Sequence, residues 1–266
     1  METEEEYPVL QRATSHLGDL LELDYTHPGG QVVPLALFLL SILLYYEACE
    51  SRSWVKLSAK IPLSLLFCYV GYTSYLLTQE ADVDALYYRK IVCFGLVLGL
   101  VGDIFLAIDA KSCFVLGLIS FLLGHLMYVV AFAFLVEISP VTVMQQVVDP
   151  MVMALQCILV VSSIIIFVGL SPYLGDLKPY VVVYIFVITC MVGAAIYVFF
   201  DAHYFWEGRL FILVGSISFY ISDIFVASNK FLGRSFMNRA FTLPAYYFGQ
   251  FLIAFSIAML HDGVNY

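Results

Sequence analysis

The chain has 266 residues, of which 62% are hydrophobic and only 12% are charged. That apolar content exceeds what a water-soluble domain of this length can bury, so the composition excludes soluble classes and indicates a membrane protein. The net charge is −9 at pH 7, but much of the acidity lies in the first 24 residues. The short alternating segments of a closed barrel are missing, which leaves an all-α polytopic bundle. Membrane lipids, and no nucleic acid, are the partners to expect.

Residues 1–31 are expected to form an acidic, solvated N-terminal tail ahead of one membrane domain at residues 32–261. The chain opens METEEEYPVL, without a basic stretch before its first apolar run. A cleavable secretory signal is therefore not expected, and the first apolar span should direct insertion.

Eight apolar runs, broken by polar residues, Pro or Gly, are each near the roughly 20 residues that a helix needs to cross a membrane. They predict eight transmembrane helices, at residues 32–49, 57–78, 91–108, 113–136, 150–170, 180–200, 209–227 and 240–260. Because the number is even, both termini should lie on the same side. The sequence carries no signal for an oligomeric state.

Two of these spans end in similar motifs. GDIFLA at residues 102–107 returns as SDIFVA at residues 222–227, four spans later, and Gly124-His125 in the following helix corresponds to Gly249-Gln250. The similarity predicts two four-helix repeats.

The predicted halves cover about residues 32–136 and 150–261. Four spans per half is an even number, so the halves should run parallel, related by an axis along the membrane normal. Asp103 and Asp223 should then lie at similar depth, near the same membrane face.

These two aspartates are the candidate catalytic residues. An ionised carboxylate at the centre of a span costs about 3 kcal/mol, so such residues usually face the protein interior and mark function. Gly95, Gly99 and Asp103 recur every four residues, on a face of small residues that allows a neighbouring helix to approach. The alternative is that each aspartate only hydrogen-bonds a neighbouring helix and fixes the packing.

Other polar side chains could line or orient the site. His125 is the only histidine of the sequence that falls within a predicted span. It either packs as a satisfied polar group or orients Asp103 or a bound water. One buried histidine with two aspartates falls short of a catalytic zinc site, so no metal is expected. The candidate pocket residues are His125, Tyr128, Ser222, Tyr246, Tyr247 and Gln250.

Basic residues cluster just after the second aspartate, at Lys230, Arg234 and Arg239. Lysine and arginine beside a span are usually topology or lipid anchors. On the membrane face nearest both acids they could also bind the phosphate of a substrate.

Taken as a set, the two aspartate motifs with GHxxY and YYxxQ downstream make the chain resemble the YhhN-type lysoplasmalogenase family, including the animal transmembrane-protein-86 group. The matching segments run from Val101 to Phe134 and through SISFYISDIFVASNKF and AYYFGQFLIAFSI. The first, second, fifth and sixth spans match only in hydropathy.

The resemblance implies hydrolysis of the vinyl ether bond of lysoplasmalogens in an intracellular membrane such as the endoplasmic reticulum. The products would be a fatty aldehyde and glycerophosphoethanolamine or glycerophosphocholine. The paired acids of the family fall on Asp103 and Asp223, and no cofactor is implied. One aspartic acid could protonate the alkene while the other, as carboxylate, stabilises the resulting cation and activates water; the sequence does not say which.

Three other functions compete. An intramembrane aspartyl protease would show GxGD, YD and PAL motifs, and none is intact here. A proton-coupled transporter also uses intramembrane acids, but it would usually have broken helices near the site, and neither aspartate helix contains proline. A lipid-binding or scaffold protein should tolerate loss of either acid.

Overall fold

The structure is a computed structural model that describes residues 28–78, 83–108, 110–136, 149–201, 204, 206–233 and 235–260. Most of the predicted acidic tail, residues 1–27, lies outside the described residues, whereas residues 28–31 belong to the first helix. Arg234 and residue 261, the last of the predicted membrane domain, also lie outside them.

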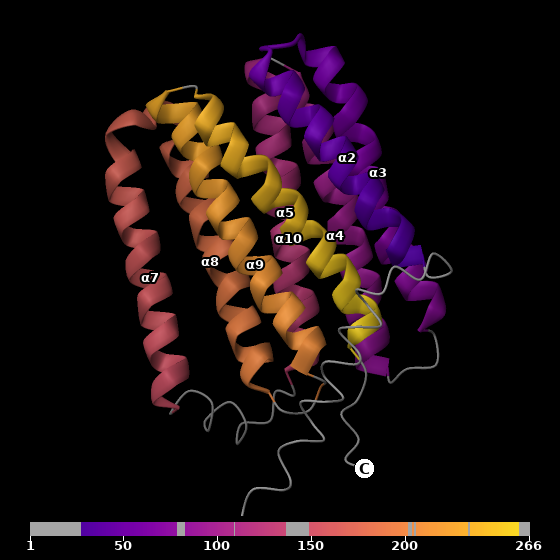
Figure 1. Ribbon diagram of the computed structural model, residues 1–266. Helices are drawn as coiled ribbons and strands as arrows, with labels where there is room; N and C mark the ends of the chain where they lie inside the picture. The colour runs from indigo at the N-terminus through magenta and orange to yellow at the C-terminus, as the bar shows by residue number, and fades with distance from the viewer. Residues whose placement is uncertain are drawn as a thin grey trace, which may run out of the picture.

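The described chain forms eight long helices, which confirms the all-α fold (Figure 1). They are α2 (Pro28–Ala48), α3 (Ser53–Leu77), α4 (Val83–Ala107), α5 (Lys111–Leu135), α7 (Pro150–Leu170), α8 (Lys178–Phe200), α9 (Trp206–Ala227) and α10 (Phe236–Met259). A π-helical turn, η3 (Ser228–Leu232), extends α9. The seven helices from α3 onward are long and apolar enough to cross a membrane, and Val32–Ala48 of α2 is a shorter apolar helix.

Helix α4 begins at Val83, eight residues before the predicted start at residue 91. The prediction was wrong here because it treated Arg89 as a loop residue. Arg89 instead lies buried inside the helix, and its guanidinium donates hydrogen bonds to the carbonyls of Thr78 and Leu260, the latter at 3.0 Å. Carbonyl oxygens at nearby helix ends therefore satisfy the charge within the bundle.

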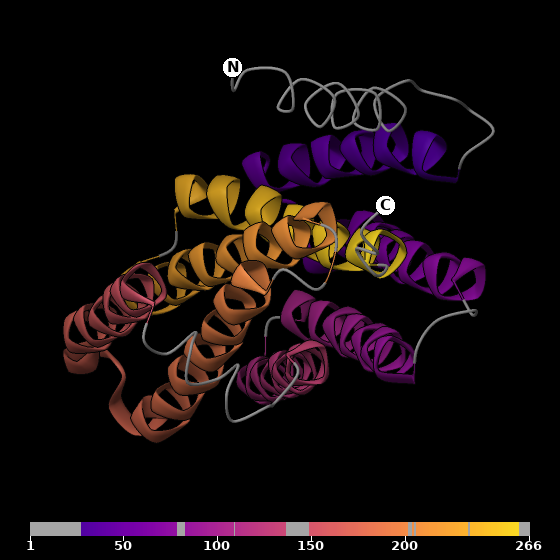
Figure 2. The same cartoon turned by 90° about the horizontal axis from the view of Figure 1, so that it is seen from below.

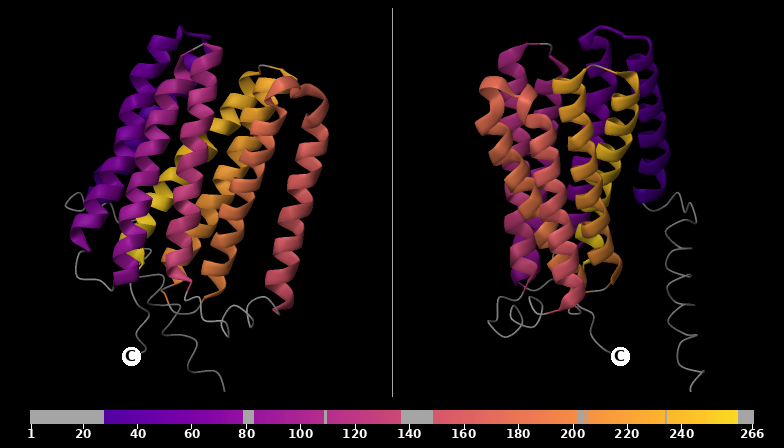
Figure 3. Two further views of the ribbon diagram at one scale, coloured as in Figure 1. Left: turned by 180° about the vertical axis from the view of Figure 1, so that it is seen from behind. Right: turned by 90° about the vertical axis from the view of Figure 1, so that its left-hand side faces the viewer.

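Successive helices alternate in direction, so the start of α2 and the end of α10 lie at the same end of the bundle (Figures 1 and 3). Helices α4 and α9 run in the same direction, and Asp103 and Asp223 each lie one turn before the last residue of their helix. Both acids therefore lie near the opposite end of the bundle, at similar depth. Figure 2 shows α2 and α7 on opposite flanks, with α9 and α10 between them.

Glycines set the close approach of two helix pairs, α4 with α5 and α9 with α10. A Cβ atom added at Gly124 would lie 3.4 Å from the Gly95 carbonyl oxygen, and one added at Gly249 would lie 2.9 Å from that of Gly215. The same two positions thus make the same contact in each half. Between the halves, α3 packs on α10 and α5 packs on α8. The repeat that would explain this arrangement stays a prediction.

Candidate active site

Asp103 and Asp223 both line one cavity, which holds about 1040 Å³ of free space counted out to its open mouth. Its charged lining residues within the described chain are these two acids with Lys60 and Lys230. Most of the remaining lining consists of Leu, Ile, Val and Phe side chains from α5, α7, α8 and α9. The cavity therefore joins two carboxyl groups to a mainly apolar space.

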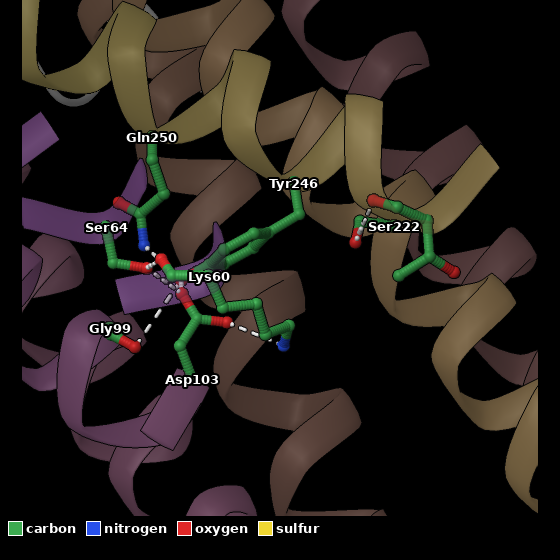
Figure 4. A network of polar contacts seen from close by, with 8 residues as sticks. Lys60, Ser64, Gly99, Asp103, Ser222, Tyr246 and Gln250 are labelled. Carbon is green, nitrogen blue, oxygen red and sulfur yellow. Dashed lines mark hydrogen bonds and ion pairs between the residues drawn. The ribbon is translucent and has the colours of Figure 1, made fainter. Parts of the chain in front are cut away.

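The Asp103 carboxylate is buried and contacts three hydrogen-bond donors (Figure 4). Lys60 Nζ of α3 lies 3.1 Å from Oδ1. Ser64 Oγ, one turn further along α3, lies 2.6 Å from Oδ2, and the Tyr246 hydroxyl of α10 donates to the same oxygen at 2.8 Å. A cation and two hydroxyls thus surround this acid.

A chain of hydrogen bonds leads from α5 through α10 to Asp103. The Tyr128 hydroxyl donates to Gln250 Oε1 at 2.9 Å, and Gln250 Nε2 donates to the Tyr246 hydroxyl at 3.3 Å. Gly99 provides the space, because a Cβ atom there would lie 2.5 Å from Gln250 Nε2. The small-residue face of α4 therefore accommodates the side chains that orient Asp103.

Asp223 has different partners and a side chain that is 20% exposed. The Tyr184 hydroxyl of α8 donates to its Oδ2 at 2.8 Å, and His125 Nε2 of α5 lies 3.2 Å from the same atom. His125 Nε2 is also 3.0 Å from the Tyr184 hydroxyl, and the ring packs edge-on against Phe219. Of the roles considered for His125, the geometry supports an orienting one, but toward the acid of the other half rather than toward Asp103.

The other predicted pocket residues, Ser222 and Tyr247, form no hydrogen bond with either acid within the described part of the chain. Ser222 lines the cavity and donates to the Thr242 carbonyl at 3.2 Å, apart from the Asp103 network in Figure 4. Tyr247 is buried, with its ring centroid 4.8 Å from that of Tyr246. Tyr247 therefore supports Tyr246 by packing.

Of the three basic residues predicted to bind a head group, Lys230 alone is found at the cavity within the described chain. Its Nζ lies 4.0 Å from the centroid of the Phe114 ring. Arg239 does not line the cavity; its Nε lies 2.9 Å from Glu47 Oε2, an atom that Lys56 Nζ also approaches at 2.7 Å. That carboxylate holds Arg239 against α2 and α3.

Sequence reasoning missed Lys60, Ser64 and Tyr184 as site residues. Lys60 did carry a signal, because it is a basic residue within an apolar span, and Ser64 lies four residues later on the same helical face. Tyr184 carried none, since the chain has 19 tyrosines and many belong at membrane interfaces.

Each acid is held by helices from both predicted halves. Asp103 of α4 meets α3 of its own half and α10 of the other, whereas Asp223 of α9 meets α8 of its own half and α5 of the other. No group of three His, Cys, Asp or Glu side chains that could hold a metal occurs among the residues described. Two carboxyl groups with different partners in one apolar cavity can divide acid and base roles.

Comparison with known proteins gives one family and one curated relative. Residues 75–257 match the YhhN family. The lysoplasmalogenase TMEM86A of Bos taurus is 26% identical over 251 residues, which cover 89% of this chain and 92% of the relative. No solved structure shows a significant match. The family match includes both acids, whereas Lys60 and Ser64 precede it.

Proposed function

This chain belongs to the YhhN family, and from that premise we propose that it is a lysoplasmalogenase in the endoplasmic reticulum or another intracellular membrane. The substrate is a lysoplasmalogen, a 1-alkenyl-glycerophosphoethanolamine or 1-alkenyl-glycerophosphocholine. Hydrolysis of its vinyl ether bond releases a fatty aldehyde and glycerophosphoethanolamine or glycerophosphocholine. The observation that carries the proposal is the pair of aspartates, Asp103 and Asp223, lining one mainly apolar cavity.

The chemistry of a vinyl ether suits two carboxyl groups. A proton adds to the alkene carbon distal to the oxygen and leaves an oxocarbenium ion, which water attacks to give a hemiacetal. The hemiacetal then collapses to the aldehyde and the free glycerol hydroxyl. One aspartic acid supplies the proton, and the other, as carboxylate, stabilises the cation and takes a proton from water. Glycosidases divide the work between two carboxyl groups in the same way.

The cavity also suits the shape of the substrate. Its Leu, Ile, Val and Phe lining favours a hydrocarbon chain. Lys230 follows Asp223 by seven residues along α9 and η3, about 10 Å at the rise of a helix. A lysine at that separation is well positioned for a phosphate that one glycerol unit links to the reacting bond. Arg234 stays a predicted second phosphate ligand.

Proton-coupled transport is the second candidate function, because an intramembrane acid paired with lysine also suits a proton pathway. Helices α4 and α9, which carry the acids, contain no proline, although α3 and α10 contain Pro62 and Pro244. Uptake of a solute driven by a pH gradient in vesicles would favour this alternative.

Mass spectrometry of the purified full chain tests the proposal. The protein is given a lysoplasmalogen or its saturated alkyl ether analogue, with matched head group and chain length. Fatty aldehyde should form from the vinyl ether and not from the alkyl ether, because a saturated ether has no alkene carbon to protonate. Absence of aldehyde from the vinyl ether would contradict the proposed function.

A further inference from the structure

Resting on that proposed function, we infer that Lys60 sets the different roles of the two acids. It stabilises Asp103 as the ionised carboxylate, so that Asp223 is the proton donor. Lys60 precedes the residues that match the family, and its side chain lines the cavity with 12% of its surface exposed. It is a positioning residue, because it acts on the substrate through Asp103.

The contacts of Asp103 suit a negative charge. The Lys60 ammonium can donate hydrogen bonds but cannot accept them, and its nitrogen lies 3.1 Å from Oδ1. The Tyr246 hydroxyl accepts from Gln250 Nε2 and donates to Oδ2 at 2.8 Å, an acceptor closer than the Gly99 carbonyl at 3.4 Å. A proton on Asp103 would have to share these two oxygens with donors that already occupy them. The ionised carboxylate is the form that satisfies the site.

The contacts of Asp223 are neutral. His125 Nδ1 is buried without a hydrogen-bond partner among the described residues. A proton on Nδ1 would be an unsatisfied buried donor, so the ring is neutral and carries its proton on Nε2, facing Asp223 and Tyr184. No lysine or arginine of the described chain lies within ion-pair distance of Asp223. In an apolar cavity, the acid without a cation is the one that keeps its proton.

These protonation states give a balanced reaction. Asp223 transfers its proton to the distal alkene carbon, which forms the oxocarbenium ion beside the Asp103 carboxylate. Water adds to the cationic carbon and gives a proton to Asp103. As the hemiacetal collapses, Asp103 returns that proton to the departing glycerol oxygen, and the hemiacetal hydroxyl gives its proton to Asp223. Both acids finish in their starting states.

Chemical rescue tests the role of Lys60 in the full-length protein. Lys60→Ala should lower kcat for lysoplasmalogen on the order of 100-fold, the lower end of what a positioned acid-base group contributes, and added ethylammonium should restore at least about a tenth of the lost rate. Lys60→Arg, which keeps the cation, should have a higher kcat than Lys60→Ala. Lys56→Ala is the matched control, because it removes a 2.7 Å ion pair one turn away on α3, outside the cavity. It should show no kcat loss that ethylammonium restores.

A second rescue separates the two acids. At neutral pH formate is an anion with no proton to give, so it should restore activity to Asp103→Ala and not to Asp223→Ala. Any other pattern, or wild-type kcat in Lys60→Ala, overturns the division of labour. These failures are distinct from failure of the proposed function, which is the absence of aldehyde from the wild-type protein.

Discussion

In the α4–α5 pair and in the α9–α10 pair, the two helices approach each other through glycine. The residue that follows the glycine of the second helix in each pair, α5 or α10, is different. In α5 it is His125, which contacts Asp223, and in α10 it is Gln250, which links Tyr128 to Tyr246 and so to Asp103. Equivalent backbone positions thus carry different polar groups, each directed at the acid of the other half.

The difference shows how one backbone arrangement can support two unlike acids. Small residues fix the helix spacing, and that spacing brings Asp103 and Asp223 to the same cavity. The polar residues of neighbouring helices then give one acid a lysine and the other a tyrosine and a histidine. Because each acid takes partners from both halves, neither half should form a working site alone.

The largest difference between the two acids should appear when one tyrosine hydroxyl beside each of them is removed. Tyr184→Phe leaves Asp223 with His125, whereas Tyr246→Phe leaves Asp103 with Lys60 and Ser64. Asp223 becomes negatively charged as it gives up its proton, and a hydrogen bond to a charged group is worth about 1.5–3 kcal/mol. We therefore expect kcat to fall roughly 10- to 100-fold in Tyr184→Phe and by less in Tyr246→Phe.

Rates of aldehyde release from lysoplasmalogen measure this difference, with thermal stability in detergent as the control for folding. A larger loss in Tyr246→Phe at equal stability would mean that the contacts of Asp103 are the less redundant.

The two glycine contacts should differ in their tolerance of a methyl group. Gly249→Ala would bring Cβ within 2.9 Å of the Gly215 carbonyl, so α10 must move and unfolding should become easier by about 1–3 kcal/mol. In Gly124→Ala the nearest atom lies at 3.4 Å, and the gain in helix propensity, about 1 kcal/mol, offsets any strain.

Thermal midpoints of the two variants, measured in the same detergent, check this expectation. Equal midpoints would show that the α9–α10 contact is no tighter than the α4–α5 contact.

The smallest effect should come from the far end of the hydrogen-bond chain. Tyr128→Phe removes a neutral hydrogen bond to Gln250, two links from Asp103. Such a bond is worth about 0.5–1.5 kcal/mol, so kcat should fall by roughly 2- to 10-fold. Kinetics with lysoplasmalogen check this, and a loss as large as that of Tyr184→Phe would mean that Tyr128 acts on the site directly.

Hydropathy predicted most of the fold, because a helix must be long and apolar to cross a membrane. It misjudged helix starts where charges are satisfied inside the bundle. Helix α3 begins at Ser53 rather than residue 57, so Lys60 lies two turns inside the helix instead of near its start. A lysine that the predicted span places near its start is therefore the partner of a candidate catalytic acid.

The aspartates were predictable because an intramembrane carboxylate is costly and the motif around it recurs. Their partners depend on which helices pack together, and hydropathy does not encode that. His125 reaches Asp223 because α5 packs on α8, and Arg239 turns to Glu47 because α10 lies beside α2. Composition and spacing give no signal for either contact.

The most direct test of the account compares aldehyde release from lysoplasmalogen by the wild-type protein, Asp103→Asn and Asp223→Asn. All three are purified as the full chain, with equal thermal stability as the sign of retained folding. Removal of either acid should lower the rate on the order of 1,000-fold, within the range that general acid-base groups contribute. Turnover at the wild-type rate by either folded variant would contradict a mechanism in which both aspartates act on one bond.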